Sequence, residues 1–290
     1  MDFLRNLLRL TRPLSNIKNI ALILFAFYLS GADFNLKIIL LGIISLSLVQ
    51  SSIYAYNSLN DQETDRKNPE KNHYFQAVQY FGSRKIFFII LFLIVSGFIA
   101  GLAINIYFVF SLVALLIVNF LYSSKYTRFK EKILLDIFSG GALGFLIRFI
   151  ASWFIFKISF PPILALLSLF SVKTAGYLLY KELDRGALNV LNIKNSITAV
   201  SKKTIIVIST VLFSLALFSF ILMCLNQRYF QLNYLGILPF RFLILLPFAI
   251  LPIIVIYLSV FKKINIKVWE LRVLGLIFLL LLTIIIWRLL

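Results

Sequence analysis

Nine apolar runs, most of them long enough to cross a bilayer, follow one another along the chain with only short polar segments between them. A transmembrane helix needs roughly 20 consecutive apolar residues. Hydrophobic residues make up 61% of the chain and charged residues 14%, whereas a soluble domain carries about 25% charge. A water-soluble core cannot hide that much apolar surface, so the sequence predicts an all-α, polytopic membrane protein with nine transmembrane helices. The runs are 18–32, 36–58, 84–102, 105–123, 133–156, 160–180, 204–225, 240–261 and 270–288.

The basic residues are unevenly divided between the segments that join these runs. Most of the 29 lysines and arginines fall near the N-terminus and in every second connection, namely 59–83, 124–132, 181–203 and 262–269. Cytoplasmic loops carry an excess of lysine and arginine. We therefore expect a plasma (inner) membrane protein whose N-terminus, large loops and active site face the cytoplasm. No separate soluble domain is left over, so residues 1–290 form one transmembrane domain in this interpretation.

The net charge of +18 does not indicate nucleic-acid binding, because the basic residues punctuate apolar runs instead of forming one basic domain. Membrane lipids with anionic headgroups and phosphorylated substrates are better partners for charge spread in this way. The single cysteine, Cys224, lies in an apolar run, which excludes a disulfide framework and a zinc cluster. The basic amphipathic N-terminus has no small-residue cleavage site, so we expect no cleavable signal peptide.

The end of the second apolar run carries the clearest sign of chemistry. Asn57, Asp61 and Asp65 recur every four residues in NSLNDQETD, so a helix places them on one face. Two carboxylates and an amide oxygen suit Mg²⁺, which takes a few hard oxygen ligands and completes its shell with water and phosphate oxygens. Arg66 and Lys71 follow closely and could hold the same phosphates. The alternative from spacing alone is a solvated helix end, where charges gather for solubility.

This stretch resembles the first aspartate-rich motif of the UbiA-type intramembrane prenyltransferases, which reads N-D-x-x-D-x-x-x-D. Asn57, Asp61 and Asp65 match the motif, while Ser58 replaces its second residue, which lies off the shared face. The resemblance implies a UbiA-like fold, Mg²⁺ as the cofactor and an enzyme that acts on a diphosphate-bearing donor. It also implies that Asp61 and Asp65 are catalytic and that the three residues together bind the metal.

Three further stretches resemble one branch of that family, the decaprenyl-phosphate phosphoribosyltransferases, which join phosphoribosyl diphosphate to a polyprenyl phosphate. TRPLSNIKN matches an R-P-x-x-x-x-K-N pattern, and NPEKN keeps the proline and lysine of H-P-x-K-R. The stretch 122–151 matches Y-S followed by D-x(7)-G-F-x-L-R-x-x-A. The matching residues are Arg12, Pro13, Lys18, Asn19, Pro69, Lys71, Tyr122, Ser123, Asp136, Gly144, Phe145, Arg148 and Ala151.

An arginine inside the fifth run also has a physical reason to be functional. A charge deep in a span costs about 3 kcal/mol or more unless it is paired or faces a polar cavity. Arg148 lies well inside the run that Asp136 opens, and Gly140 and Gly144 lead towards it at four-residue spacing. We interpret this as a cavity wall in which Arg148 binds a phosphate and Asp136 joins the metal or ribose site. The structural alternative is that the glycines only allow close helix packing.

The loop after the sixth run matches neither branch of the family well. Aromatic-acceptor members carry D-x-x-x-D there, and this chain offers Asp184 but has Leu188 at the second position. The phosphoribosyl branch carries K-R-x-x-E, and this chain keeps Glu182 but has two leucines at the Lys-Arg positions. Lys173 or Lys181 could substitute for the missing basic residues. A single acidic motif with a basic second loop favours the phosphoribosyl branch.

The motifs and the resemblance together predict a Mg²⁺-dependent transferase that moves a phosphoribosyl group from phosphoribosyl diphosphate to a polyprenyl phosphate in cell-envelope synthesis. One alternative is transfer of a prenyl chain from a prenyl diphosphate to an aromatic or other lipid acceptor. Another is a transporter of a phosphorylated lipid. His73, the only histidine, is interpreted as a solvated loop residue. Asp136 joins the expected catalytic residues, and the expected substrate-binding residues are Lys18, Arg66, Lys71, Tyr122, Arg148, Lys181, Glu182 and Asp184.

Overall fold

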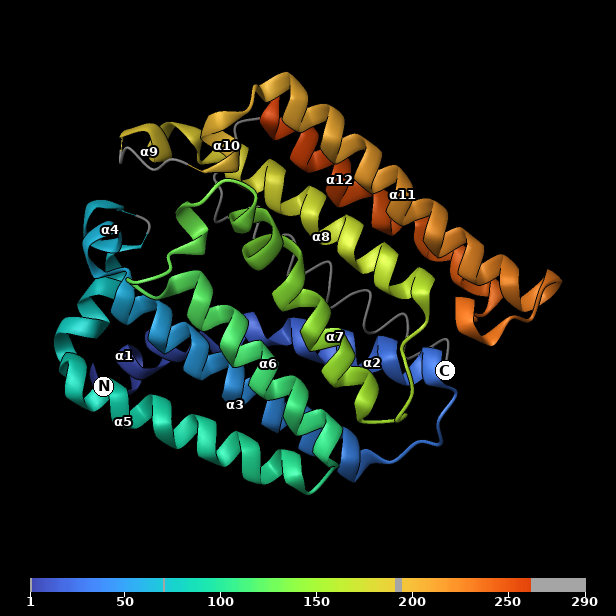
Figure 1. The fold of residues 1–290 in the computed structure, drawn as a ribbon, viewed down its shortest axis with the longest axis horizontal. Coiled ribbons are helices and arrows are strands. Elements are labelled where there is room, and N and C mark those ends of the chain that lie inside the picture. Colours follow the sequence, from blue (N-terminus) through green and yellow to red (C-terminus); the bar gives the residue numbers. More distant parts are fainter. Residues whose placement is uncertain (1, 70, 191–194, 262–290) are drawn as a thin grey trace. The chain divides into compact units, whose positions relative to one another are not determined.

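The structure is a computed structural model that describes residues 2–69, 71–190 and 195–261, in which helices are joined by turns and short loops (Figure 1). No strand occurs among these residues, in agreement with the all-α prediction. The α-helices are α1 (Asp2–Thr11), α2 (Ile17–Ser30), α3 (Leu36–Asn60), α4 (Gln62–Lys67), α5 (Asn72–Leu102), α6 (Ile106–Ser123), α7 (Gly144–Phe154), α8 (Ile163–Leu183), α9 (Arg185–Val190), α10 (Ser196–Ala199), α11 (Lys202–Tyr229) and α12 (Leu246–Val260). The 3₁₀ turns are η1 (Pro13–Asn16), η2 (Phe129–Glu131), η4 (Asn233–Leu235) and η5 (Phe240–Leu245), and η3 (Ile137–Leu143) is a π-helix.

Seven helical segments in the described residues are long and apolar enough to cross a membrane. A bent pair, Asn233–Leu245 with Ile250–Val260, turns by 73° and makes an eighth if it counts as one span. The first eight predicted runs each overlap a helix of the structure. The ninth, 270–288, lies outside the described residues. The prediction of a helical membrane protein is therefore confirmed, but the count of nine helices is not.

The main difference from the predicted boundaries is the early start of α5 at Asn72. The expected loop 59–83 is largely helical, because α4 and the first turns of α5 occupy it. Ala77 and Phe81, one turn apart on α5, are buried against Leu10 of α1. A search for uninterrupted apolar runs misses such an amphipathic stretch, because its outer face is polar.

Two compact units make up the chain. The first contains the described residues up to Ala26, together with Ala32–Phe129 and Ile147–Ile158. The second contains Phe27–Gly31, Lys130–Leu146 and the described residues from Ser159 onward. Each unit has its own hydrophobic core.

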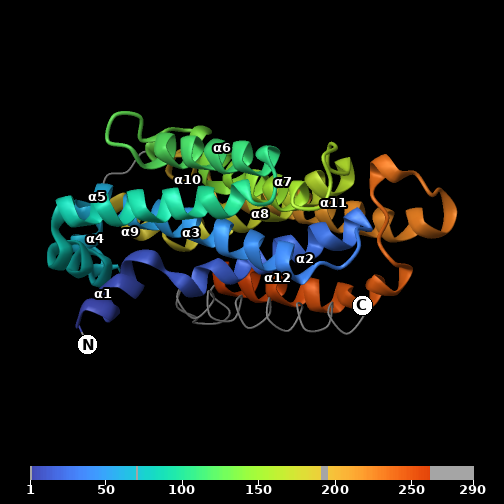
Figure 2. The same ribbon diagram turned by 90° about the horizontal axis from the view of Figure 1, so that it is seen from below.

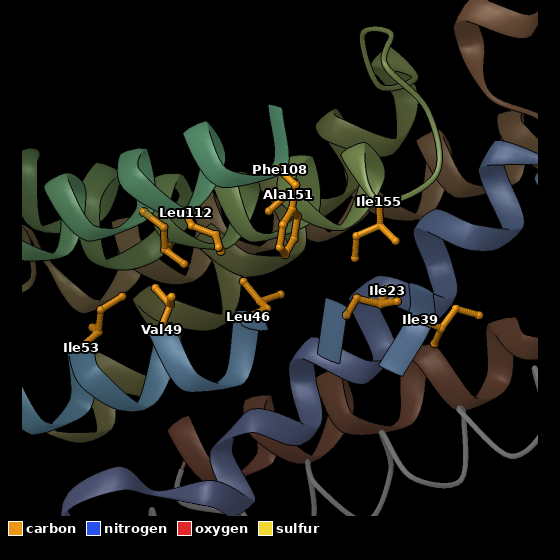
Figure 3. Close-up of a cluster of buried hydrophobic side chains, with 10 residues drawn as sticks. Ile23, Ile39, Leu46, Val49, Ile53, Phe108, Leu112, Ala151 and Ile155 are labelled. Atoms are coloured by element: carbon orange, nitrogen blue, oxygen red, sulfur yellow. The ribbon is translucent and has the colours of Figure 1, made fainter. Parts of the chain in front are cut away.

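The core of the first unit forms where α3 packs against α5 and α6. Figure 3 shows Leu46, Val49 and Ile53 from α3 facing Phe108 and Leu112 from α6. All five side chains are almost fully buried. Burial of each such side chain contributes about 1.5–3 kcal/mol, so this contact fixes the position of α3, the helix that carries the first acidic motif.

The long helix α5 has two different faces. Its inner face approaches α3 so closely that a Cβ added at Gly97 would lie 2.8 Å from the Val49 side chain. On the outer face Phe88, Phe92 and Ile99 are each more than half exposed. A contiguous apolar face of this kind on a protein surface marks contact with a membrane or partner. Together with the length of the helix, it identifies α5 as a lipid-facing span of an integral membrane protein.

In the second unit α8 and α11 run side by side in both views (Figure 1 and Figure 2). Their core includes Leu178 and Leu179 from α8 with Ile205 and Phe213 from α11. Helix α12 joins them through Ile256, and Lys202 at the start of α11 donates a hydrogen bond of 2.6 Å to the last carbonyl of α12. Leu188 and Ile197, from the segment between α8 and α11, belong to the same core.

Candidate active site

Asn57, Asp61 and Asp65 remain linked through consecutive helical hydrogen bonds although α3 itself ends at Asn60. The backbone N–H of Asp61 donates to the carbonyl of Asn57 over 2.9 Å, and that of Asp65 donates to the carbonyl of Asp61 over 2.8 Å. Asp61 is both the C-cap of α3 and the N-cap of α4, with φ −99° and ψ 11°. The i→i−4 hydrogen bonds thus continue from Asn57 to Asp65, although the backbone departs from helical geometry at Asp61.

The three side chains sit at different depths in the first unit. Asp65 is 4% exposed, while Asp61 and Asn57 are half-buried. The Oδ1 atom of Asn57 is buried and has no hydrogen-bond partner among the described residues. A buried amide oxygen without a partner costs about 1–3 kcal/mol unless a ligand or water satisfies it. An unsatisfied amide oxygen is a hard ligand of the kind that Mg²⁺ takes together with carboxylates.

The donor set also argues against a softer metal. Among the described residues no group of three His, Cys, Asp or Glu side chains lies close enough to hold a metal ion. Zinc sites are built from such groups, whereas Mg²⁺ is commonly held by one or two carboxylates plus substrate phosphates. Asn57, Asp61 and Asp65 therefore suit a magnesium–diphosphate complex better than a structural zinc site.

Arg12 is a residue beside this site that the sequence argument does not place there. Its Nη2 donates to Ser58 Oγ over 2.9 Å. Its guanidinium carbon lies 3.6 Å from the ring centroid of Tyr74 and 5.3 Å from that of Tyr54. Arg12 thus joins the segment before α2 to the end of α3 and the start of α5, next to Asn57. The R-P pattern marks this arginine in the sequence, but a contact across 46 residues leaves no local signal.

Arg148 is the most deeply placed of the predicted phosphate-binding residues. It lies on α7, is 9% exposed and interacts electrostatically with Tyr54 of α3. Tyr54 precedes Asn57 by three residues, so the two are neighbours on α3. Arg148 therefore lies near α3 about one turn before Asn57, on the side of the acidic residues that is further from the helix end.

The other predicted basic residues of the first unit lie nearer the surface. Arg66 is exposed on α4, with its guanidinium 5.9 Å from the Phe75 ring. Lys71 is half-buried at the residue before α5. Lys18 is half-buried in the first turn of α2. Arg66 and Lys71 both follow Asp65 closely along the chain.

Tyr122 and His73 both lie at helix ends in the first unit. Tyr122 is half-buried in the last turn of α6. His73 belongs to the first turn of α5 rather than to a loop, and its ring centroid lies 3.9 Å from that of Tyr74. The prediction that His73 lies in a loop is therefore wrong. The early start of α5 is the reason.

Asp136 is fully buried in the second unit and is held by hydroxyl groups. Ser196 Oγ donates to its Oδ1 over 2.5 Å, and Tyr177 OH donates to its Oδ2 over 3.5 Å. Ser196 Oγ also accepts from the backbone N–H of Leu134 over 2.7 Å. Burial raises the pKa of Asp136, although the hydrogen bonds from Ser196 and the nearby charge of Lys181 act in the opposite direction. The carboxyl group therefore ties the start of η3 to α10.

The glycine face predicted ahead of Arg148 is not continuous. Residues Ile137–Leu143 form a π-helix, in which hydrogen bonds span five residues instead of four. Gly140 lies in this π-helix, so its four-residue spacing does not place it on the face of α7 that Gly144 and Arg148 share. The close approach occurs at Gly141 instead, where an added Cβ would lie 3.4 Å from the Tyr177 ring.

The second loop has hydrophobic residues where both branches of the family carry charged ones. Leu178, Leu179 and Leu188 are all in the core of the second unit. Glu182 is nearly buried and is paired with Arg185, whose Nη2 lies 2.7 Å from Oε2. The same Nη2 donates to the carbonyl of Val200 over 2.8 Å.

Two predicted substrate-binding residues remain accessible in that loop. Lys181 is half-buried, and its Nζ lies 5.9 Å from the Tyr177 ring centroid. Its positive charge also interacts with the carboxylate of Asp136. Asp184 is the half-buried cap at the end of α8. The predicted residues of the second unit thus form one group around Asp136 and Tyr177, and a second around Glu182 and Arg185.

These features define a class of protein: a helical integral membrane protein with oxygen-bearing side chains at a helix end and a buried arginine that interacts with the same helix. The chain belongs to the UbiA prenyltransferase family, whose model matches residues 19–282. A search of curated protein sequences found no match.

Solved structures share the fold. The apo structure of a UbiA homolog from Aeropyrum pernix K1 has a TM-score of 0.72 and 15% identity, over 94% of this chain and 97% of that one. A digeranylgeranylglyceryl phosphate synthase structure has a TM-score of 0.68 and 21% identity, over 98% of each chain. A UbiA homolog from Archaeoglobus fulgidus bound to GPP and Mg²⁺ has a TM-score of 0.59 and 20% identity, over 90% and 100%.

Proposed function

We propose that this chain is a Mg²⁺-dependent transferase that moves a phosphoribosyl group from phosphoribosyl diphosphate to a polyprenyl phosphate and releases diphosphate. The observation that carries the proposal is the linked series Asn57, Asp61 and Asp65, with its buried unsatisfied amide oxygen. A homologous fold bound to both a prenyl diphosphate and Mg²⁺ supports metal-assisted departure of diphosphate. We place the reaction at the cytoplasmic face of the plasma membrane, on the strength of the basic loops.

The residues of this chain divide the work of binding the donor. Asn57, Asp61 and Asp65 hold the metal, which when bound offsets negative charge on the leaving diphosphate. Arg66 and Lys71 bind the outer phosphate oxygens by charge-assisted hydrogen bonds. Arg148 provides positive charge on the inner side, where few water molecules compete.

The chemistry of the acceptor decides which other groups the reaction needs. Breaking the bond between C1 and oxygen leaves an oxocarbenium-like ribose, which a buried site shields from water. A polyprenyl phosphate is anionic at neutral pH, so its oxygen can attack C1 without a strong base. His73 lies against Tyr74 and is not required as a base in this scheme.

The second loop supports a phosphoribosyl donor over a prenyl donor. Aromatic-acceptor members that this chain resembles carry a second aspartate where Leu188 stands, and Leu188 is 7% exposed within a hydrophobic core. A leucine in that position cannot serve as a ligand of a second metal ion. The chain therefore has one acidic motif and a basic second loop that contains Lys181, and this combination favours the phosphoribosyl donor.

A second candidate function is transfer of a prenyl chain from a prenyl diphosphate to an aromatic or lipid acceptor. Structures of the Archaeoglobus fulgidus homolog bound to GPP and to DMAPP, each with Mg²⁺, favour this candidate. It uses the same metal residues but produces an allylic cation. A phenol or aromatic carbon must lose a proton, so this reaction needs a base that a phosphate acceptor does not.

Diphosphate release from the purified protein tests the proposal. We expect release with phosphoribosyl diphosphate, polyprenyl phosphate and Mg²⁺, and none when the donor is a prenyl diphosphate. Release with a prenyl diphosphate alone would support the second candidate instead. Flux of a phosphorylated lipid across liposomes without any diphosphate release would contradict both and indicate a transporter.

A further inference from the structure

Two asparagines at the start of α2 are buried with part of their hydrogen-bonding capacity unused. Asn16 is 8% exposed, and its Nδ2 donates to the carbonyl of Ser47 over 3.3 Å and to Ser51 Oγ over 2.9 Å. Its Oδ1 is buried and has no partner among the described residues. Asn19 is fully buried, and neither its Nδ2 nor its Oδ1 has a hydrogen-bond partner there. Buried polar groups in proteins are nearly always paired with protein, water or a ligand.

The segment that carries these amides lies along α3 and leads inward from the acidic end. Arg12 holds one end of the segment on Ser58, and Asn16 holds the other on Ser51. Ser51 and Ser58 are two turns apart on one face of α3, which is about 10 Å along the helix. Asn19 follows Asn16 by three residues, so the two amides are neighbours.

In the proposed reaction the donor's sugar lies on this inward side of its diphosphate. A polyprenyl acceptor is a membrane lipid and can reach C1 of the donor only from within the membrane. A donor held by its diphosphate at Asp61 and Asp65 therefore presents its sugar inward, along the side of α3 that Asn16 and Asn19 cover.

The amide atoms of Asn16 and Asn19 that have no partner among the described residues indicate which kind of ligand could bind there. Two amide oxygens need hydrogen donors, and one amide nitrogen needs an acceptor. A phosphate group at neutral pH offers acceptors and almost no donors, while a prenyl chain offers neither. The hydroxyl groups of a sugar offer both.

We propose that Asn16 and Asn19 form a subsite for the ribose hydroxyls of the donor. The inference rests on the proposed function and deepens it by naming the groups that distinguish a sugar donor from a prenyl donor. Asn19 receives one hydroxyl through both of its amide atoms, and Asn16 Oδ1 accepts from a neighbouring hydroxyl.

Binding measurements on an Asn19→Leu variant test the subsite. Dissociation constants are measured by calorimetry with Mg²⁺ for phosphoribosyl diphosphate and for inorganic diphosphate, which lacks the sugar. We expect affinity for phosphoribosyl diphosphate to fall about tenfold, which corresponds to ~1.4 kcal/mol. Affinity for diphosphate should stay within about twofold, and the melting temperature should not fall, because Asn19 loses no hydrogen bond to the described residues.

Two further variants complete the design. Ser209→Ala is the matched control, because Ser209 on α11 is also fully buried with an unpaired hydroxyl, and it should leave both affinities unchanged. Asn19→Ser keeps a smaller polar group and should give an intermediate loss, which provides a reading if the leucine variant does not fold.

The possible results separate the subsite from the proposed function. Equal loss of affinity for both ligands, or loss for neither, contradicts the subsite. Wild-type protein that binds phosphoribosyl diphosphate through Asn19 but transfers nothing contradicts the proposed function alone. Wild-type protein that does not bind phosphoribosyl diphosphate contradicts both.

Discussion

At the scale of single residues, the account depends on two carboxylates held one helical turn apart. Asp65 is 4% exposed and Asp61 is half-buried. Like charges at this spacing destabilise a helix, and burial increases the cost of each. A divalent cation held by both carboxylates would offset this repulsion. The sequence reveals the spacing, whereas the burial of Asp65 and the unsatisfied oxygen of Asn57 emerge only from the structure.

Isosteric neutralisation tests the two aspartates directly. We expect Asp61→Asn and Asp65→Asn each to lower Mg²⁺-dependent diphosphate release by at least about 100-fold, the loss typical of removing one group that stabilises developing charge. Without Mg²⁺ the melting temperature should stay the same or rise, because a repulsion is relieved. Glu63→Gln is the matched control, since Glu63 is exposed on the same short helix. Wild-type activity in either aspartate variant would falsify the site.

Asp136 gives a prediction about pH. Burial raises its pKa in the folded protein, so the folded state binds its proton more tightly than the unfolded state does. Its contribution to stability is therefore most favourable at low pH, and it declines as pH rises above the unfolded pKa of about 3.9. Asp136→Asn removes this dependence. Thermal unfolding between about pH 4 and pH 8 should show the variant gaining stability relative to wild type as pH rises, and a constant difference would contradict the prediction.

At the scale of elements, the junction between α1 and α2 positions Arg12 beside the end of α3. Arg12 adopts a left-handed backbone conformation with φ 48°, which is uncommon for a residue with a side chain. Pro13 follows and begins the 3₁₀ turn η1. The chain therefore changes direction here, and the Arg12 side chain is directed to Ser58, Tyr54 and Tyr74.

Two substitutions separate the backbone of Arg12 from its side chain. Both Arg12→Gly and Arg12→Ala remove the guanidinium, so we expect similar losses of diphosphate release, of about tenfold. Glycine accepts a positive φ without strain, whereas alanine does not, so the alanine variant should be less stable by about 1 kcal/mol. Thermal unfolding checks the difference. An alanine variant as stable as the glycine variant would show that the turn is not under strain.

At the scale of the whole molecule, much of the fold could be predicted, because bilayer thickness fixes the length of apolar runs. The missed start of α5 is amphipathic, and the π-helix at Ile137–Leu143 changes hydrogen bonding without any marker in composition. For the proposed site, local spacing was enough to predict that Asn57, Asp61 and Asp65 act together. Arg12 and the Asp136–Ser196 bridge join residues far apart in sequence, so they could not be read from spacing.

The affinity for inorganic diphosphate, measured with Mg²⁺ and again after its removal with a chelator, tests most directly whether these side chains gather a metal around diphosphate. In wild type, metal removal should weaken binding at least about tenfold, since the phosphate oxygens share the cation's shell. In Asp61→Asn the affinity should be weak and nearly independent of Mg²⁺. Equal affinity with and without Mg²⁺ in wild type, or an undiminished response in the variant, would contradict the account.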